Sequence, residues 1–417
     1  MSYETYRVAD LIDEIAMGPF GSNIKVSCFV DSGVPVLNGS NLEGFSLSEK
    51  AFRFVTKEKA DSLNKANAHR GDIVITHRGT LGQIAFIPQD SRYDRYVISQ
   101  SQFRVRCNDK VLPEYLVYYF HTPIGQHKLL SNASQVGVPA LARPSSTFQQ
   151  IEVELPELSI QKRVVEIITT IQKKIENNQE LNDNLRQQAQ ALFKKWFVDN
   201  PDAILWKEGT FSNLIEKTIS GDWGKDSPSG NNTEMVYCIR GADIPEVRAG
   251  NKGKMPTRYI LPKNYAAKQL VDGDIVVEIS GGSPTQSTGR AAAVSDALLA
   301  RYDKGMVCTN FCKALKPRAG YSMYVYYYWQ YLYDRDIFFS YENGTTGIKN
   351  LDINGFIETE PIVIAPEDLV EKFDAVCQTV FSKIYANGME NEQLALVRDT
   401  ILPKLMSGEI DVSAVQL

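Results

Sequence analysis

Glycine-rich polar loops with nearby cations recur at matching places in the two halves of the chain. The first half contains GPFGSNIK (18–25), THRGT (76–80) and SQVG (134–137), and the second contains SGDWGK (220–225), SGGS (280–283) and TTG (345–347). Glycine lets backbone amides approach phosphate oxygens. Arg, Lys, Asn and Gln side chains contact phosphates and base edges. Each loop alone is more typical of an ordinary turn, but their recurrence in both halves predicts a nucleic-acid interface.

The side chains that we predict to contact nucleic acid lie in or just after these loops. In the first half they are Ser22, Asn23, Lys25, His77, Arg78, Thr80, Gln135 and Arg143. In the second half they are Lys225, Ser283, Gln286, Arg290, Thr346, Lys349 and Asn350. We expect Arg78 to read a base and Lys25 to hold a phosphate, with a solvated turn cation as the alternative for each.

Catalytic and cofactor motifs are missing from the sequence. The phosphate-binding patterns GxxxxGK[ST] and GxGxxG are absent. So are the carboxylate–lysine signature common in nucleases and the Asp/Asn-Pro-Pro-aromatic tetrad of amino-methyltransferases. The four histidines all lie in the first half, which argues against a duplicated histidine-based active site or metal site. We therefore predict a protein without catalytic or metal-binding residues, and an enzyme with an unrecognised motif, such as a nuclease, remains the alternative.

Composition places the chain among soluble globular proteins. It has 417 residues, 43% hydrophobic and 23% charged, and no apolar run long enough for a membrane helix. Six scattered cysteines form neither a disulfide framework nor a zinc spacing, so we expect a cytoplasmic protein. The net charge of −5 arises almost wholly in residues 361–417, which carry 4 basic and 9 acidic side chains. Any nucleic-acid surface must therefore be a local patch.

An internal repeat covers the whole chain. GDIVI (71–75) recurs as GDIVV (273–277), QSQFRV (100–105) resembles CTNFCK (308–313), and EYLVYYF (114–120) resembles MYVYYYW (323–329). The offsets are 202, 208 and 209, and GVPAL (137–141) meets GIKNL (347–351) at 210. The repeat predicts two globular α+β domains, residues 1–156 and 201–365, each followed by a helical segment, residues 157–200 and 366–412, and a short tail, 413–417. The segments EYLVYYF and MYVYYYW are expected to be helices, and their many aromatic side chains favour core packing over base stacking.

The helical segments carry apolar residues at alternating spacings of four and three, which is typical of a coiled-coil seam. In the first segment the seam consists of Val164, Ile168, Ile171, Ile175, Asn178, Asn182, Leu185, Ala189, Leu192 and Trp196. In the second it consists of Phe373, Cys377, Val380, Ile384, Asn387, Asn391, Leu394, Arg398, Ile401 and Leu405. At 1.5 Å per residue the first seam predicts a rod of about 48 Å.

Two asparagines lie at the middle of each seam. An antiparallel helix pair would place Asn178 opposite Asn391 and Asn182 opposite Asn387, where a buried amide layer fixes the register. A parallel pair would also match asparagine with asparagine, but the termini of the intervening domain are expected to lie close together, which favours antiparallel helices. The alternative is that each helix packs on its own domain and leaves the asparagines exposed.

The chain resembles the specificity subunit of type I restriction–modification systems. The resemblance rests on the GPFGS loop, the repeated GDI strand, LPELSIQKRVVEIITTIQKKIE and LRQQAQALFKKWF in the first helical segment, and LVRDTILPKLMSGEI in the second. It covers about residues 1–412 and implies two target recognition domains, 1–156 and 201–365. It also implies two conserved helical regions, 157–200 and 366–412, that pair as antiparallel spacer helices.

The resemblance also implies the function and the partners. Each recognition domain would read one half of a bipartite sequence in double-stranded DNA. The helices would bind two methyltransferase subunits that use S-adenosylmethionine, and two restriction–translocase subunits would add ATP- and magnesium-dependent restriction. The specificity subunit itself would bind no cofactor and would have no catalytic residues. A stand-alone duplicated DNA-binding or scaffold protein is the alternative, and an unrecognised nuclease is a further one.

Overall fold

The computed structural model describes residues 3–19, 21–134, 137–283, 285–344 and 348–412, which fold into two compact units. The first unit consists of residues 1–172 and 395–417, and the second consists of residues 173–394. The two long helices, α5 (Leu158–Phe193) and α11 (Glu367–Met406), each contribute to both units. Each unit therefore contains one globular domain and a stretch of both helices.

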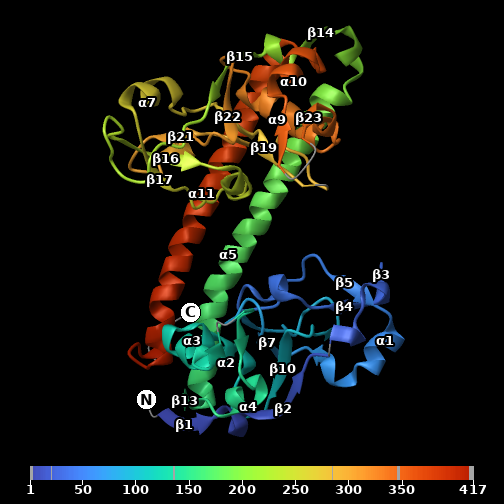
Figure 1. The fold of residues 1–417 in the computed structure, drawn as a ribbon, viewed down its shortest axis with the longest axis vertical. Helices are drawn as coiled ribbons and strands as arrows, with labels where there is room; N and C mark the ends of the chain where they lie inside the picture. The colour runs from blue at the N-terminus through green and yellow to red at the C-terminus, as the bar shows by residue number, and fades with distance from the viewer. Residues whose placement is uncertain (1–2, 20, 135–136, 284, 345–347, 413–417) are drawn as a thin grey trace. The chain divides into compact units, whose positions relative to one another are not determined.

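The first unit contains two main sheets (Figure 1). An antiparallel sheet has the spatial order β2 (Ile12–Met17), β10 (Gln102–Cys107), β7 (Ile73–Thr76) and β8 (Ile84–Phe86). A five-stranded sheet has the order β3 (Phe29–Val30), β5 (Arg53–Val55), β4 (Val34–Val36), β9 (Arg95–Val97) and β6 (Asn67–His69), in which β4 and β9 are parallel. Two short pairs complete the unit, β1 (Tyr3–Arg7) with β13 (Glu152–Pro156) and β11 (Ala133–Ser134) with β12 (Ala140–Leu141).

The second unit repeats this plan. Its four-stranded sheet has the order β15 (Ile215–Ser220), β22 (Cys312–Pro317), β18 (Ile275–Glu278) and β20 (Ala291–Ala293). A three-stranded sheet has the order β17 (Thr257–Ile260), β16 (Glu234–Ile239) and β21 (Met306–Cys308), in which β16 and β21 are parallel. The remaining strands are β14 (Lys207–Thr210) with β25 (Pro361–Ile364), and β19 (Ser280–Gly281), β24 (Lys349–Leu351) and β23 (Glu342–Asn343).

Strand pairing confirms the internal repeat and corrects one of its offsets. Val105 of β10 pairs with Ile73, and Leu315 of β22 pairs with Ile275, the counterpart of Ile73. These strands therefore correspond at an offset of 210, so the sequence match of QSQFRV with CTNFCK at 208 is wrong by two residues. The physical reason is that the register of a β-ladder is fixed by its backbone hydrogen bonds and by which face of the strand is buried. A match between short stretches of sequence contains neither kind of information. Phe311, which the sequence match aligned with buried Phe103, is 59% exposed.

Short helices cover the sheets. In the first unit these are α1 (Lys57–Ser62), α2 (Pro113–His121), α3 (Pro123–Leu130) and α4 (Pro144–Gln149). In the second unit they are α6 (Ile244–Arg248), α7 (Pro262–Lys268), α8 (Asp296–Leu299), α9 (Ser322–Tyr333) and α10 (Ile353–Thr359). The aromatic helices α2 and α9 pack on the sheet edges β8 and β20, and their aromatic residues lie in the two largest cores. Core packing of these aromatics is thus confirmed.

The long helices pair antiparallel. In the second unit Asn178 Nδ2 donates to Asn391 Oδ1 at 2.9 Å, and Asn387 Nδ2 donates to Asn182 Oδ1 at 2.8 Å. All four asparagines are buried, so the alternative of exposed asparagines is wrong. In the first unit Val164 and Ile168 share a core with Leu402 and Leu405. Helix α5 ends in a π-helical turn, Lys194–Val198, and α11 contains Pro403 in its last turn.

No helix in the described part of the chain is both long and apolar enough to span a membrane. The six cysteines carry no disulfide.

Candidate nucleic-acid interface

A glycine anchors the first predicted loop of each domain at the same place in the fold. Gly18 follows β2 and Gly221 follows β15. A Cβ atom on Gly18 would lie 1.9 Å from the Ser99 carbonyl oxygen, and one on Gly221 would lie 1.9 Å from the Thr309 carbonyl oxygen. Only glycine permits this approach of two backbone segments. Each loop is thereby held beside the segment that precedes the central strand, β10 or β22.

The three cations predicted as contacts in the first domain are all exposed. Lys25 precedes the 3-10 turn Val26–Cys28, and Arg78 forms an isolated β-bridge with Ala140, next to the β11–β12 hairpin. Arg143 has a left-handed backbone conformation, with φ of 46°, directly before α4. Within the described residues these three side chains have no ion pair, so their charges are available to a phosphate or a base edge.

His77, another predicted contact residue of the first domain, is half-buried. Its Nε2 atom lies 3.2 Å from the Gln100 carbonyl oxygen, and burial lowers the pKa of the imidazole. His77 is therefore neutral at pH 7 and contributes a hydrogen-bonding edge rather than a charge. Asn23 and Thr80 are exposed, Ser22 lies in the 3-10 turn Gly21–Asn23, and Gln135 lies outside the described residues.

Two of the three cations predicted in the second domain are already paired with buried carboxylates. Arg290 donates to both Glu278 oxygens, at 2.7 and 2.8 Å, and Glu278 is 8% exposed. Lys349 lies 2.8 Å from Glu342, which is 6% exposed. The hydrogen bond from Glu278 raises the pKa of Arg290. Burial raises the pKa of Glu342, but hydrogen bonds from Lys349 and Thr288 outweigh it and lower that pKa. A buried carboxylate that loses its ion-pair partner destabilises the folded state. The main role of Arg290 and Lys349 is therefore to stabilise the second domain.

Lys225, Ser283 and Gln286 lie in loops of the second domain, and Asn350 lies in β24. Lys225 is exposed and forms an isolated β-bridge with Tyr259. Ser283 and Gln286 close a turn through mutual backbone hydrogen bonds. Asn350 Oδ1 accepts a hydrogen bond from the Ser280 hydroxyl at 2.5 Å, and Thr346 lies outside the described residues. Lys225 is thus the predicted cation of this domain that keeps an unpaired charge within the described residues.

Sequence reasoning missed several side chains beside these loops, of which Arg53 is exposed and Arg258 is buried and paired with Asp226. The Arg53 guanidinium lies 5.2 Å from the Phe29 ring centre, and that of Arg258 lies 4.0 Å from the Trp223 ring centre. Gln100 and Asn310 are exposed at corresponding points before β10 and β22. The similarity of QSQFRV and CTNFCK could have indicated that Gln100 and Asn310 correspond. The two-residue error in the offset between these segments hid that correspondence.

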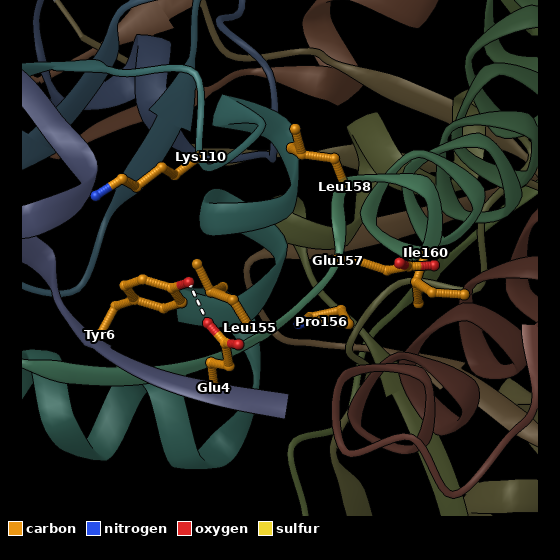
Figure 2. Close-up of a pocket in the computed structure, with 8 residues that line it drawn as sticks. All are labelled: Glu4, Tyr6, Lys110, Leu155, Pro156, Glu157, Leu158 and Ile160. Atoms are coloured by element: carbon orange, nitrogen blue, oxygen red, sulfur yellow. Dashed lines mark hydrogen bonds between the residues drawn. The ribbon is translucent and has the colours of Figure 1, made fainter. Parts of the chain in front are cut away.

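The first unit contains a cavity that is not suited to nucleic acid. Figure 2 shows this cavity of about 490 Å³, which lies where β1 and β13 meet the start of α5. Two of its three charged side chains, Glu4 and Glu157, are acidic, and Lys110 is the third. It contains none of the predicted contact residues. Among the described residues no group of three or more His, Cys, Asp or Glu side chains is arranged to hold a metal ion.

Comparison with known proteins shows similarity to one family of DNA-specificity proteins. The model of the type I restriction modification DNA specificity domain matches residues 3–187. The chain is 24% identical to the MjaIX type I restriction enzyme specificity subunit of Methanocaldococcus jannaschii, with 96% of this chain and 92% of that protein covered. Over residues 3–187 the chain therefore matches the type I DNA specificity domain, and over nearly its whole length it is similar to a type I restriction–modification specificity subunit.

One further curated relative and one solved structure are also similar to this chain. The HindI specificity subunit of Haemophilus influenzae is 25% identical, with 82% of this chain and 87% of that protein covered. The crystal structure of a type I specificity subunit from M. genitalium superposes with a TM-score of 0.54 at 15% identity, covering 97% and 96% of the two chains. The fold of that subunit is therefore shared along nearly the whole chain.

Proposed function

We propose that this chain is a specificity subunit that reads a bipartite sequence in double-stranded DNA, one half with each recognition domain. The observation that carries the proposal is the duplication itself. The four-stranded sheet has the same strand order in both units, while the exposed loop residues differ between them. Two similar domains with different surface chemistry suit two different half-sites.

We further propose that the chain is a non-catalytic component of a larger assembly. It would join two methyltransferase subunits and two restriction–translocase subunits in the cytoplasm. Its partners would use S-adenosylmethionine for methylation, and ATP with Mg²⁺ for restriction, while this chain binds no cofactor. The names of its relatives support the assembly as a class, and the missing catalytic motifs support a non-catalytic role.

Exchange of one recognition domain tests the two-reader model. Replacing residues 1–156 by those of a relative should change one half of the methylated motif and leave the other half intact. The measurement is methylation-sensitive sequencing of host DNA after co-expression with the methyltransferase. A change in both half-sites at once would contradict the model. Plasmid cleavage by the isolated chain with magnesium alone would indicate a nuclease, and failure to co-purify with a methyltransferase would indicate a stand-alone protein.

Alanine substitution of the exposed loop cations tests the predicted DNA contacts. Arg78→Ala should weaken cognate binding by roughly 1–3 kcal/mol and relax one position of the motif. Lys25→Ala should weaken all sequences alike and reduce the salt dependence by about one unit of slope. The measurement is binding of the assembled methyltransferase complex across a salt series.

Arg290→Ala provides the contrast in the same experiment. This substitution leaves Glu278 buried and unpaired. We therefore expect it to destabilise the second domain rather than to change one position of the methylated motif selectively. Unaltered affinity and motif in the Arg78 and Lys25 variants would remove both residues from the interface.

A further inference from the structure

Each recognition domain contains a cavity beside its glycine-anchored loop. The cavity of the first domain has a volume of about 410 Å³ and lies between Gly21, the end of β4 and the segment Ser99–Gln100. The cavity of the second domain has a volume of about 490 Å³ and lies between Trp223, the turn after β16 and the segment Thr309–Phe311. Neither cavity was apparent from the sequence.

Strand pairing shows that the two cavities occupy the same position in the repeated fold. In the first domain β4 and β9 are parallel, and the Leu37 amide donates to the Val97 carbonyl at 2.8 Å. In the second domain β16 and β21 are parallel, and the Thr309 amide donates to the Ile239 carbonyl at 3.0 Å. With the contacts of Gly18 to Ser99 and of Gly221 to Thr309, this register makes Gln100 and Asn310 counterparts.

A second wall is also built in the same way in both cavities. The Asn38 amide donates to the Asn41 side chain at 3.0 Å, and the Arg240 amide donates to Asp243 at 3.0 Å. Each contact closes a 3-10 turn directly after the parallel strand, β4 or β16. Because Arg240 also donates to Asp243 through its guanidinium, its side chain belongs to the wall and is not free for a ligand.

The exposed side chains that face the cavities differ between the domains. The first cavity has Gln100 and Arg53, and Arg53 has no ion pair within the described residues. The second has Asn310 with two exposed aromatic rings, Trp223 and Phe311, which are 38% and 59% exposed. The Arg258 guanidinium lies over the Trp223 ring in a cation–π contact, and Arg258 Nε donates a hydrogen bond to the Trp223 carbonyl oxygen at 2.8 Å. Large exposed aromatics at a hollow in the surface mark a binding site.

We propose that these two cavities are the positions where each recognition domain distinguishes bases of its half-site. In the first domain the readers are Arg53 and Gln100, and in the second they are Asn310 and Phe311. Gln and Asn amides match the adenine edge, Arg matches guanine, and an apolar ring contacts the thymine methyl group. A duplicated framework with different free side chains gives two readers of different sequence. This inference rests on the proposed function and deepens it.

The test compares single substitutions in the co-expressed methyltransferase complex, read by methylation-sensitive sequencing and by binding to variant duplexes. Gln100→Ala should relax one position in one half-site and reduce discrimination there roughly 10-fold to 100-fold. Asn310→Ala should do the same in the other half-site only. Asn231→Ala, an exposed asparagine of the second domain that does not line the cavity, is the matched control and should leave the motif unchanged.

The outcomes separate this inference from the function on which it rests. If the wild-type complex methylates a bipartite motif but Gln100→Ala, Asn310→Ala and Phe311→Ala all retain it unchanged, the cavities are not the reading sites and the proposed function stands. If one substitution alters both half-sites, the assignment of one cavity to each half is wrong. If the wild-type complex produces no bipartite motif, the proposed function fails and the inference fails with it.

Discussion

Replacing Gly388 with alanine should destabilise the second unit by about 3 kcal/mol, although alanine normally favours a helix over glycine by about 1 kcal/mol. Gly388 lies in α11, and a Cβ atom there would be 1.9 Å from the Gly250 carbonyl oxygen. That carbonyl cannot easily move, because Arg301 donates to it at 2.6 Å. The neighbouring Ala249 carbonyl accepts from Asn182 at 3.1 Å. Packing should therefore outweigh helix propensity.

The measurement for Gly388→Ala is the denaturant midpoint of the transition that includes the second unit. Gln179→Ala is the matched control, because Gln179 holds the equivalent place in the first long helix and is exposed. Its effect should stay within about 0.5 kcal/mol. A midpoint that rises for Gly388→Ala would show that the segment around Gly250 does not dock on α11 as described.

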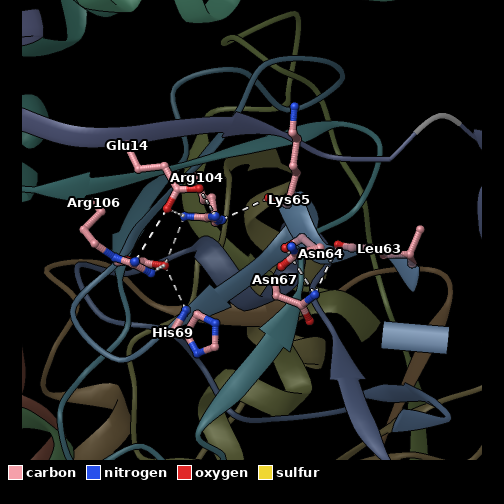
Figure 3. A network of polar contacts seen from close by, with 9 residues as sticks. Glu14, Leu63, Asn64, Lys65, Asn67, His69, Arg104 and Arg106 are labelled. Atoms are coloured by element: carbon pink, nitrogen blue, oxygen red, sulfur yellow. Dashed lines mark hydrogen bonds and ion pairs between the residues drawn. The ribbon is translucent and has the colours of Figure 1, made fainter. Parts of the chain in front are cut away.

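Replacing Asp72 with alanine should destabilise the first unit by about 3–5 kcal/mol, because it breaks a buried ion-pair network. Figure 3 shows the surroundings of Arg104, which is 4% exposed and donates to both oxygens of Glu14 at 2.5 and 3.1 Å. Asp72 is 1% exposed, lies 3.6 Å from Arg104, and accepts from Arg106 at 2.9 and 3.1 Å. Its removal leaves buried positive charge with too few partners.

Asp94→Ala is the control for Asp72→Ala, because Asp94 forms an ion pair with Arg70 at 3.1 Å but is 90% exposed. Its loss should cost less than about 1 kcal/mol. Equal effects of the two substitutions on the denaturant midpoint would contradict the importance of burial in this network.

The same network gives a pH dependence with a defined sign. The hydrogen bond from Arg104 lowers the pKa of Glu14 below its usual value. Glu14 therefore contributes stability above its unfolded pKa of about 4.3, and this contribution is lost as the pH falls through the lower folded value. Glu14→Gln should flatten the decline of the midpoint between about pH 5 and pH 3, and an unchanged decline would show that Glu14 does not titrate in this network.

The duplication and the long helices were predictable because their signals are local and periodic. The GDIV strands, the aromatic helices α2 and α9, and the four-three spacing of the seam each follow from residues close together in the chain. The opposition of Asn178 with Asn391 and of Asn182 with Asn387 followed as well, because a seam with one polar layer allows few registers.

The chemistry of the loops depended on tertiary contacts. Glycine-rich turns with cations look alike in a sequence, but strand pairing brings Arg290 onto Glu278 and Lys349 onto Glu342, while Lys25, Arg78 and Lys225 stay exposed. Pairing is decided by which carboxylates become buried beside each cation, and burial exists only in the folded chain.

The position of the cavities was likewise decided by the fold. The amino-acid sequence alone predicted two recognition domains joined by paired helices, because hydrophobic periodicity and internal repetition are properties of the local sequence. The ladder between β10 and β7 and that between β22 and β18 set which residues correspond, and thereby placed Gln100 and Asn310 at equivalent walls. Register is a property of hydrogen bonds between distant strands, so only the tertiary structure contained it.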